Sequence, residues 1–290
     1  MNFSAAVSFD RRESPFATGE LLAGTYEIRG VVGEGGMGVV YDAHDRLLRR
    51  RVAIKAALDP QYAPALLNEA RALASIKSPQ FVEVFHVGAH RGVAYMVMER
   101  LYGETLFAHV FQTYRSGSRI AICEAIELLG AIASALSTAH EAGIAHRDLK
   151  SPNVILAPRG RVVLLDLGLS VPEVLAGEAF EADGSPEYVA PEVLRGEVER
   201  GEGVLVDLYA LGVVAFEVLT GRTPFAADDL QRTLNAHLRA VPPDVRTLRE
   251  DVPDALAVLV RRMLLKNPRS RPTSAQEIVF ELRSMRTFVR

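Results

Sequence analysis

The sequence predicts an α+β protein with two lobes, the first rich in strands and the second helical. Two observations support this prediction. Short β-branched runs separated by glycine-containing turns fill residues 26–98, and a long, largely apolar helix is expected further on, over residues 120–141. At 290 residues and 31.6 kDa the chain is long enough for each lobe to have its own apolar core.

The composition is ordinary for a soluble globular protein and argues against several classes of partner. The chain has 33 basic and 36 acidic residues, and its net charge of −3 does not favour binding to nucleic acid or anionic lipid. Its single cysteine, Cys123, excludes an internal disulfide and fits a reducing, cytoplasmic compartment. No apolar run reaches the roughly 18 residues of a membrane span. We therefore expect no nucleic-acid partner and no membrane segment in this chain.

The first 22 residues predict a flexible N-terminal extension. Charged residues interrupt any apolar stretch of the kind that a signal peptide needs, and Ser14, Pro15 and Gly19 favour extended or irregular backbone. We place the strand-rich lobe at residues 23–101 and the helical lobe at residues 102–290.

A glycine-rich turn follows the first predicted strand, residues 26–32. The turn contains Gly33, Gly35 and Gly38, and the β-branched and aromatic residues 39–41 then continue as a second strand. A dinucleotide-binding fingerprint would require a helix after the glycines, so the order strand, turn, strand argues against that class. Because glycines let backbone N–H groups approach phosphate oxygens closely, the turn is a candidate phosphate site.

The next apolar strand, residues 51–57, contains a single lysine. Taken alone, Lys55 could equally well extend from a strand edge into solvent. Its position after the glycine turn favours a role facing a phosphate instead. Residues 61–77 predict a helix with Glu69 beside its apolar face, and a buried lysine needs a counter-charge, so we predict an ion pair between Lys55 and Glu69. Two further strands are expected, over residues 81–87 and 93–98.

Residues 146–156, with the sequence HRDLKSPNVIL, carry the densest group of candidate catalytic residues. Asp148 is a candidate base, Lys150 a candidate cation, and Asn153 could bind a metal ion through its carboxamide before the chain enters an apolar strand. If these were only polar residues of a surface loop, their joint suitability for phosphate and metal chemistry would be a coincidence. Beyond this segment, amphipathic patterns predict helices near residues 228–238, 254–265 and 274–285, in addition to one over residues 103–115.

In order and spacing, these motifs resemble those of protein kinases of the eukaryotic-like (Hanks) type. Residues 33–41, GEGGMGVVY, are similar to the sequence common at this motif in bacterial serine/threonine kinases. The resemblance covers about residues 26–285. It implies the bilobal kinase fold, in which a small antiparallel-sheet N-lobe with one main helix precedes a larger helical C-lobe. It also implies transfer of the γ-phosphoryl group of ATP to serine or threonine hydroxyls of a protein substrate, with Mg²⁺ or Mn²⁺ as the metal ion.

The resemblance assigns nucleotide-binding roles to the first lobe. Gly33, Gly35 and Gly38 would cover the phosphates, Lys55 would hold the α- and β-phosphates, and Glu69 would fix Lys55. Val40, Ala53 and Ile155 would pack on the faces of the adenine, and backbone groups of Glu99 and Leu101 would hydrogen-bond it. Met98 would occupy the gatekeeper position of this nucleotide site.

The catalytic roles implied by the resemblance lie in the second lobe. Asp148 would accept the proton of the substrate hydroxyl, Lys150 would neutralise the moving phosphoryl group, and Asn153 and Asp166 would each hold a metal ion. Lys150 also fits the serine/threonine subgroup better than the tyrosine kinases. Scaffold roles fall to Glu192, Asp207 and Arg271, a set that small-molecule kinases of similar fold usually lack.

The sequence departs from the family pattern in two places. Leu167 replaces the usual phenylalanine after the metal-binding aspartate, and a leucine can fill the same apolar slot at modest packing cost. The resemblance places an activation segment between Asp166 and Glu192, and this segment contains no threonine and is acidic. We therefore expect Glu181 or Asp183 to take the place of an activating phosphate by pairing with Arg147, although these acids could also simply solubilise the segment.

Two alternatives to an active protein kinase stay open. A pseudokinase would bind nucleotide as a scaffold, but such proteins usually lack one of the residues that are present here as Lys55, Asp148, Asn153 and Asp166. A small-molecule kinase of similar fold is the weaker alternative. Resembling proteins often dimerise through the N-lobe, and this sequence alone does not decide its oligomeric state.

Overall fold

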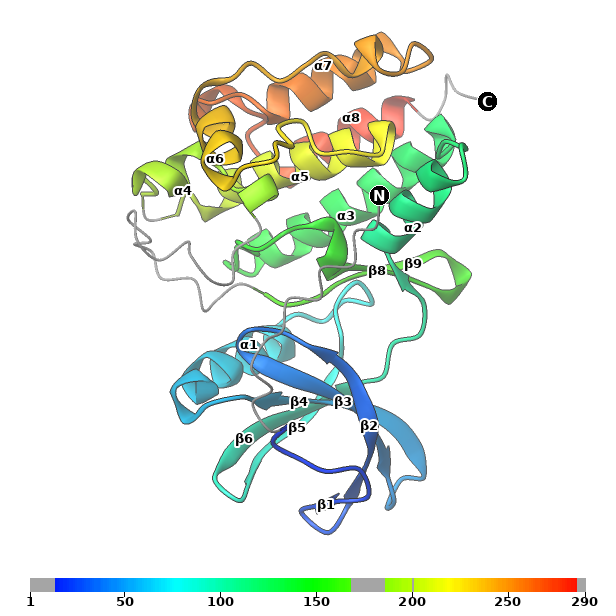
Figure 1. Ribbon diagram of the computed structural model, residues 1–290, viewed down its shortest axis with the longest axis vertical. Helices are drawn as coiled ribbons and strands as arrows, with labels where there is room; N and C mark the ends of the chain where they lie inside the picture. Colours follow the sequence, from blue (N-terminus) through cyan, green and yellow to red (C-terminus); the bar gives the residue numbers. More distant parts are fainter. Residues whose placement is uncertain (1–13, 168–185, 200, 286–290) are drawn as a thin grey trace. The chain divides into compact units, whose positions relative to one another are not determined.

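The computed structural model describes residues 14–167, 186–199 and 201–285 of the chain (Figure 1). They form two compact units. Unit 1 contains residues up to 70 together with residues 83–100, and unit 2 contains residues 71–82 and the chain from residue 101 onward. The lobe boundary expected after residue 101 lies next to this division. The chain enters unit 2 once before that point, within helix α1 (Ala63–Ser75).

Unit 1 is built on a six-stranded antiparallel sheet with the strand order β1-β2-β3-β4-β6-β5. The strands are β1 (Leu21–Leu22), β2 (Tyr26–Glu34), β3 (Gly38–Asp45), β4 (Arg50–Ala57), β5 (Val84–His90) and β6 (Val93–Glu99). Each pair of neighbours is antiparallel, and the β2–β3 hairpin carries the glycine turn. The prediction of an antiparallel-sheet lobe followed by a helical one is confirmed.

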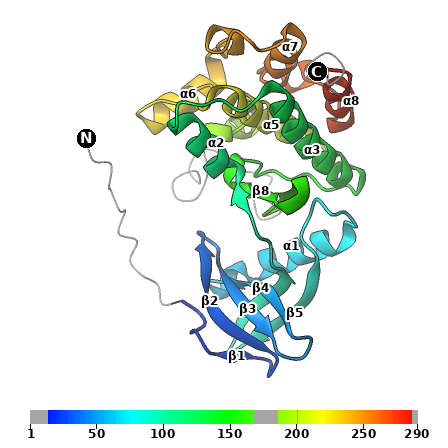
Figure 2. The same cartoon turned by 90° about the vertical axis from the view of Figure 1, so that its right-hand side faces the viewer.

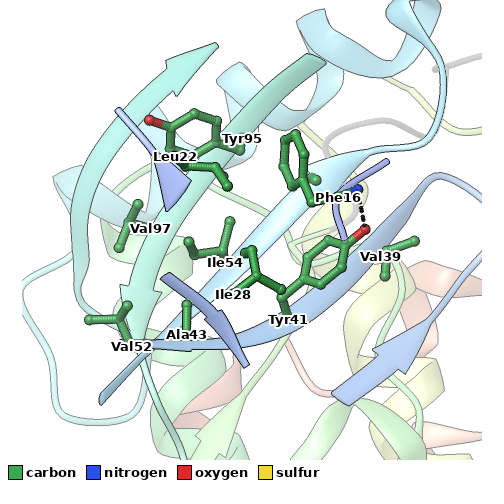
Figure 3. Close-up of a cluster of buried hydrophobic side chains, with 11 residues drawn as sticks. Phe16, Leu22, Ile28, Val39, Tyr41, Ala43, Val52, Ile54, Tyr95 and Val97 are labelled. Atoms are coloured by element: carbon green, nitrogen blue, oxygen red, sulfur yellow. Dashed lines mark hydrogen bonds between the residues drawn. The ribbon is translucent and has the colours of Figure 1, made fainter. Parts of the chain in front are cut away.

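The alternation of side chains along β3 and β4 separates the apolar core of unit 1 from the opposite face of the sheet. Tyr41 and Ile54 are fully buried in this core (Figure 3). Val40 precedes Tyr41, Lys55 follows Ile54, and the two pair with each other in the sheet. Because neighbouring residues of a strand point to opposite faces, Val40 and Lys55 lie on the other face. One face of the sheet thus stabilises unit 1 and the other carries the candidate nucleotide-binding residues.

Residues 14–22 differ from the expected flexible extension. Leu22 pairs with Tyr26 in the sheet and is fully buried, and Phe16 is only 2% exposed within the same core. A single phenylalanine in a polar stretch gives no periodic signal, which is why the sequence did not predict its burial. Residues 1–13 of the expected extension lie outside the described residues.

Unit 2 is mainly helical. Its helices are α2 (Leu106–Arg115), α3 (Ile122–Glu141), α4 (Pro191–Arg195), α5 (Gly203–Thr220), α6 (Leu230–Arg239), α7 (Asp254–Met263) and α8 (Ala275–Met285). A three-stranded sheet of β7 (Glu104–Thr105), β8 (Val154–Ala157) and β9 (Arg161–Leu164) accompanies them. Helix α3 packs against α5 and α8, and α5 packs against α7 (Figures 1 and 2).

Helices α3 and α5 are long and apolar enough to cross a membrane, judged by length and composition alone. Their apolar windows are, however, 50% and 83% buried inside the structure. The core helices of soluble proteins pass the same test, so these two helices are weak evidence for a membrane span and are explained by their packing within unit 2.

Candidate functional site

The ion pair predicted between Lys55 and Glu69 is present in unit 1. Lys55 Nζ on β4 donates to both carboxylate oxygens of Glu69 on α1, at 2.9 and 2.8 Å. The two side chains are 17% and 8% exposed. A lysine held this way has a fixed position and little freedom. The alternative that Lys55 extends from a strand edge into solvent is therefore excluded.

The register of the sheet gathers other predicted nucleotide-binding residues around Lys55. Val40 on β3 and Met96 on β6 are its two cross-strand partners, and Ala53, two positions earlier on β4, pairs with Met98. Because positions two apart share a face of a sheet, this set forms a small apolar surface beside one ammonium group. Such a surface suits a flat apolar ring next to phosphates.

Of the three glycines predicted to cover phosphates, Gly33, Gly35 and Gly38, only Gly38 is required by local packing. A Cβ atom at Gly38 would lie 2.8 Å from the carbonyl oxygen of Ala56, whereas one at Gly33 would meet no atom within 4 Å. At Gly35 the nearest atom is the carbonyl oxygen of Gly38, at 4.0 Å. The structure of the unit therefore does not itself demand glycine at positions 33 and 35.

We expect Gly38→Ala to lower the free energy of unfolding by about 1–3 kcal/mol, since its methyl group collides with backbone of the neighbouring strand. Gly33→Ala is expected to change it by no more than about 0.5 kcal/mol. Urea titrations of the two variants followed by circular dichroism provide the measurement. Equal losses in both variants would contradict this explanation of the two glycines.

In unit 2, the Asp148 carboxylate lies between two of its predicted partners. Its Oδ2 atom is 2.9 Å from Lys150 Nζ and accepts a hydrogen bond of 2.9 Å from Asn153 Nδ2. Asn153 Nδ2 also donates to the Asp148 carbonyl oxygen at 3.0 Å. The short 3₁₀ turn Ser151–Asn153 returns the chain so that the two side chains meet. The Asp148 side chain remains 35% exposed, so the carboxylate is both oriented and accessible.

The backbone of the candidate catalytic loop, residues 146–153, is anchored on α5 by Asp207. The two Asp207 oxygens accept hydrogen bonds of 2.7 Å from the backbone N–H groups of His146 and Arg147. Asp207 is 1% exposed, and His140 Nε2 on α3 lies 2.7 Å from its Oδ2. Arg147 has a left-handed backbone, with φ at 63°, which is uncommon for a residue with a side chain. The scaffold role predicted for Asp207 matches this geometry, while His140 was not identified from the sequence.

Asp166 follows β9 and also has a left-handed backbone, with φ at 54°. Its side chain is exposed, whereas that of the next residue, Leu167, is buried at 3% exposure, as expected for a leucine in an apolar slot. The Leu165 N–H donates to the Asn153 carbonyl oxygen at 2.8 Å, which ties the segment before Asp166 to the catalytic loop. Left-handed backbone thus occurs both in the loop, at Arg147, and in the segment tied to it, at Asp166. Such strained conformations are typical of functional sites.

The donor set around the catalytic loop fits a hard metal ion only in part. Both side-chain hydrogen bonds of Asn153 come from its Nδ2 atom, which leaves the amide oxygen as the possible ligand. Among the described residues, no group of three or more His, Cys, Asp and Glu side chains could hold a metal ion. A magnesium ion at Asn153 and Asp166 would therefore take its remaining ligands from phosphate oxygens and water, as this ion commonly does.

A buried glutamate links the catalytic loop to the segment that follows the undescribed residues 168–185. Glu217 on α5 accepts hydrogen bonds from Ser151 Oγ at 3.0 Å and from Tyr188 Oη at 2.8 Å. Burial raises the pKa of Glu217, and the two hydrogen bonds act in the opposite direction. Glu217 was not identified from the sequence. It is the single charged residue in the apolar run 211–219, and such a charge is the signal that could have identified it.

A second buried cluster supports α6. His237 is fully buried, its Nδ1 atom lies 2.9 Å from Tyr209 Oη, and its ring meets Phe225 edge-on. Burial, together with the nearby charge of Lys266, lowers the pKa of His237 to about 4. The unfolded chain then binds a proton at His237 near pH 6.5, while the folded protein does not bind it until about pH 4.

We therefore expect His237 to make stability decrease as the pH falls from about 6.5 to 4, by on the order of 3 kcal/mol. Urea titrations across this range should show a shallower decrease in His237→Gln than in the wild type. The exposed His86 provides the matched control, and His86→Gln should keep the wild-type slope. Identical slopes in all three proteins would exclude His237 as the titrating group.

The residues predicted from sequence fall into the two units as follows. Unit 1 contains Gly33, Gly35, Gly38, Val40, Ala53, Lys55, Glu69, Met98 and Glu99, and unit 2 contains Leu101, Asp148, Lys150, Asn153, Ile155 and Asp166. The acids expected to pair with Arg147, Glu181 and Asp183, lie outside the described residues.

Comparisons with known proteins show the family of the chain. A protein kinase domain model matches residues 26–281. The chain is 32% identical over 265 residues to the serine/threonine-protein kinase PknA of Mycobacterium tuberculosis, covering 87% of this chain and 59% of that protein. It is 30% identical over 273 residues to the serine/threonine-protein kinase PrkC of Bacillus subtilis, covering 92% of this chain and 41% of that protein. It thus spans only about half of these relatives.

A solved structure shows the same fold. The crystal structure of a point mutant of the Mycobacterium tuberculosis PknI kinase domain matches with a TM-score of 0.71 at 25% sequence identity. The match covers 93% of this chain and 98% of that one.

Proposed function

The chain belongs to the protein kinase family, and from this premise we propose that it transfers the γ-phosphoryl group of ATP to serine or threonine hydroxyls of proteins. One observation carries the proposal: the Asp148 carboxylate, oriented by Lys150 and Asn153, lies on a loop anchored by Asp207. The relatives named serine/threonine-protein kinases support the choice of acceptor.

In the proposed reaction, Asp148 acts as the base for the substrate hydroxyl. Its Oδ2 atom is occupied by Lys150 and Asn153, so we assign the proton to Oδ1. Lys150, already 2.9 Å from the carboxylate, would neutralise charge on the moving phosphoryl group. Orientation of the acceptor and neutralisation of charge are the main contributions that a protein makes to phosphoryl transfer.

The nucleotide and its metal ion complete the proposed site. We assign the phosphates to the glycine turn and to Lys55, with Glu69 as the positioning residue, and the adenine to the residues named for it above. Members of the family use ATP with a divalent metal ion, and we propose Mg²⁺, with Mn²⁺ able to replace it, at Asn153 and Asp166. When bound, the ion supplies positive charge to the β- and γ-phosphates.

We further propose that the chain phosphorylates itself and that its activity does not depend on phosphorylation of the activation segment. This second point rests on the acidic, threonine-free sequence of residues 169–188, with Glu181 or Asp183 as the partner of Arg147. Phosphatase treatment should then leave the rate of phosphoryl transfer unchanged. A large loss of rate, with a phosphate mapped to this segment, would contradict it.

The test of the function is incubation of the purified chain with Mg-ATP and casein as a generic protein acceptor, followed by intact mass measurement. We expect phosphate on the acceptor with the wild type and with Lys77→Met, an exposed control, but not with Lys55→Met. Phosphoserine or phosphothreonine in the acceptor would distinguish this enzyme from a small-molecule kinase. Binding of nucleotide without any transfer to the acceptor or to the chain itself would indicate a scaffold instead.

A further inference from the structure

Residues 14–22, called the strap below, lie before the part of the chain that matches the protein kinase model, which begins at residue 26. Two of its side chains, those of Phe16 and Leu22, are nevertheless packed into the core of unit 1. The Phe16 ring lies 5.7 Å from the ring of Tyr41 and 6.2 Å from that of Tyr95, measured between centroids, and it is 2% exposed (Figure 3). The strap is thus anchored in the core through Phe16 and Leu22, although the family match does not include it.

The strap also provides the hydrogen bonds of a buried hydroxyl. Tyr41 is fully buried, and its Oη atom accepts the Phe16 N–H at 3.1 Å (Figure 3). The same oxygen lies 2.6 Å from Ser14 Oγ. A buried hydroxyl without partners is costly, so the strap and the tyrosine stabilise each other. This places one end of the strap on β3.

Other contacts of the strap reach both β2 and the opposite edge of the sheet, at β5. Glu20 lies 3.1 Å from Nε2 of His90, the last residue of β5. It also pairs at 3.4 Å with Arg91, which lies in the turn between β5 and β6. Arg91 also donates to the Pro15 carbonyl oxygen at 3.1 Å. On β2, Ile28 exchanges backbone hydrogen bonds with Gly19 and Glu20, at 2.8 and 2.9 Å. In the sheet order, β2 and β3 are separated from β5 by β4 and β6, so the strap bridges strands that do not pair with each other.

This bridge matters for the proposed nucleotide site because different strands carry different parts of that site. The β2–β3 hairpin carries the glycine turn and Val40, whereas β4 and β6 carry Lys55 and Met98. Val40 is the chain neighbour of Tyr41 and pairs with both Gly33 and Lys55. A clamp between the hairpin and the β5–β6 turn limits how far the hairpin can rotate away from Lys55.

We propose that the strap is a positioning element for nucleotide binding, with Phe16 and Tyr41 as its key positioning residues. The inference rests on the proposed function, since it assigns the strap an effect on the same nucleotide site. Without the strap, the hairpin would move more widely, and the phosphates would be held in the productive position for a smaller fraction of the time.

The test compares Phe16→Ala and Tyr41→Phe with the wild type in the full chain. At a temperature well below unfolding, we expect Phe16→Ala to raise the KM for ATP about fivefold or more with kcat nearly unchanged, because binding rather than chemistry is affected. Tyr41→Phe keeps the ring but removes the oxygen that holds the strap, so it should show a smaller rise in the same direction. Phe16→Leu should restore most of the affinity, and Phe280→Ala, at an exposed phenylalanine, should have no effect.

Hydrogen exchange of residues 30–40 separates positioning from general stability and does not depend on activity. We expect faster exchange there in Phe16→Ala and Tyr41→Phe. A lower melting temperature with unchanged KM and unchanged exchange would overturn the proposal and leave the strap a purely structural element. If Phe16→Ala does not fold, Tyr41→Phe and Ser14→Ala decide the question by the same two readouts. If the wild type transfers no phosphate, the proposed function fails, while the exchange measurement still tests the strap.

Discussion

Asp148→Asn is expected to lower kcat for phosphoryl transfer by about 100- to 10,000-fold, the usual contribution of a general base. Asparagine has nearly the same shape and can still accept hydrogen bonds from Lys150 and Asn153, so the loop should keep its conformation. It cannot accept the proton of the substrate hydroxyl. ATP affinity should therefore change little, and the loss should appear in single-turnover measurements at saturating ATP.

Asp254→Asn is the matched control, because it makes the same chemical change at a carboxylate that is 85% exposed and outside the catalytic loop. The control should retain the wild-type rate. Thermal unfolding of both variants should also be close to that of the wild type. A kcat within about tenfold of the wild type in Asp148→Asn would contradict the assignment of Asp148 as the base.

The part of the fold that the sequence predicted well is the part determined by local pattern. The strands of unit 1 show β-branched runs bounded by glycine turns, and α3 shows a long apolar stretch. The start of the strand expected from Phe81 was predicted less well. The strand, β5, begins at Val84 instead, while Phe81 and Val82 are buried and belong to unit 2. An apolar run shows that a segment is buried, but it does not show whether the segment pairs in a sheet.

Some contacts of the candidate site could also be predicted from the sequence, and others could not. The pairing of Lys55 with Glu69 could be predicted because a buried charge requires a partner and few were within reach. The contacts of Glu217 with Ser151 and Tyr188 could not, because they join segments far apart in the chain. The strap was missed for the same reason, since the burial of Phe16 depends on Tyr41, which lies 25 residues away.

The largest effect on stability is expected at the buried ion pair of Arg271 and Glu192. Two hydrogen bonds of 2.7 and 2.8 Å join the side chains, which are 0% and 3% exposed. Arg271 also donates to the carbonyl oxygens of Leu265 and Leu205, both at 2.8 Å. Arg271→Met should lower the free energy of unfolding by about 3–5 kcal/mol, because it leaves a carboxylate buried without its partner. Since the chain has no tryptophan, circular dichroism in urea is the suitable probe.

Two further variants separate the buried charge from the loss of packing. Arg262 pairs with Glu277 and Glu281 at 2.6 and 2.7 Å, but its side chain is 35% exposed, so Arg262→Met should cost only about 1 kcal/mol or less. Adding Glu192→Gln to Arg271→Met removes the unpaired charge and should recover part of the lost stability. If the double variant is no more stable than Arg271→Met alone, the cost arises from the carbonyl groups and the packing around Arg271 rather than from the charge of Glu192.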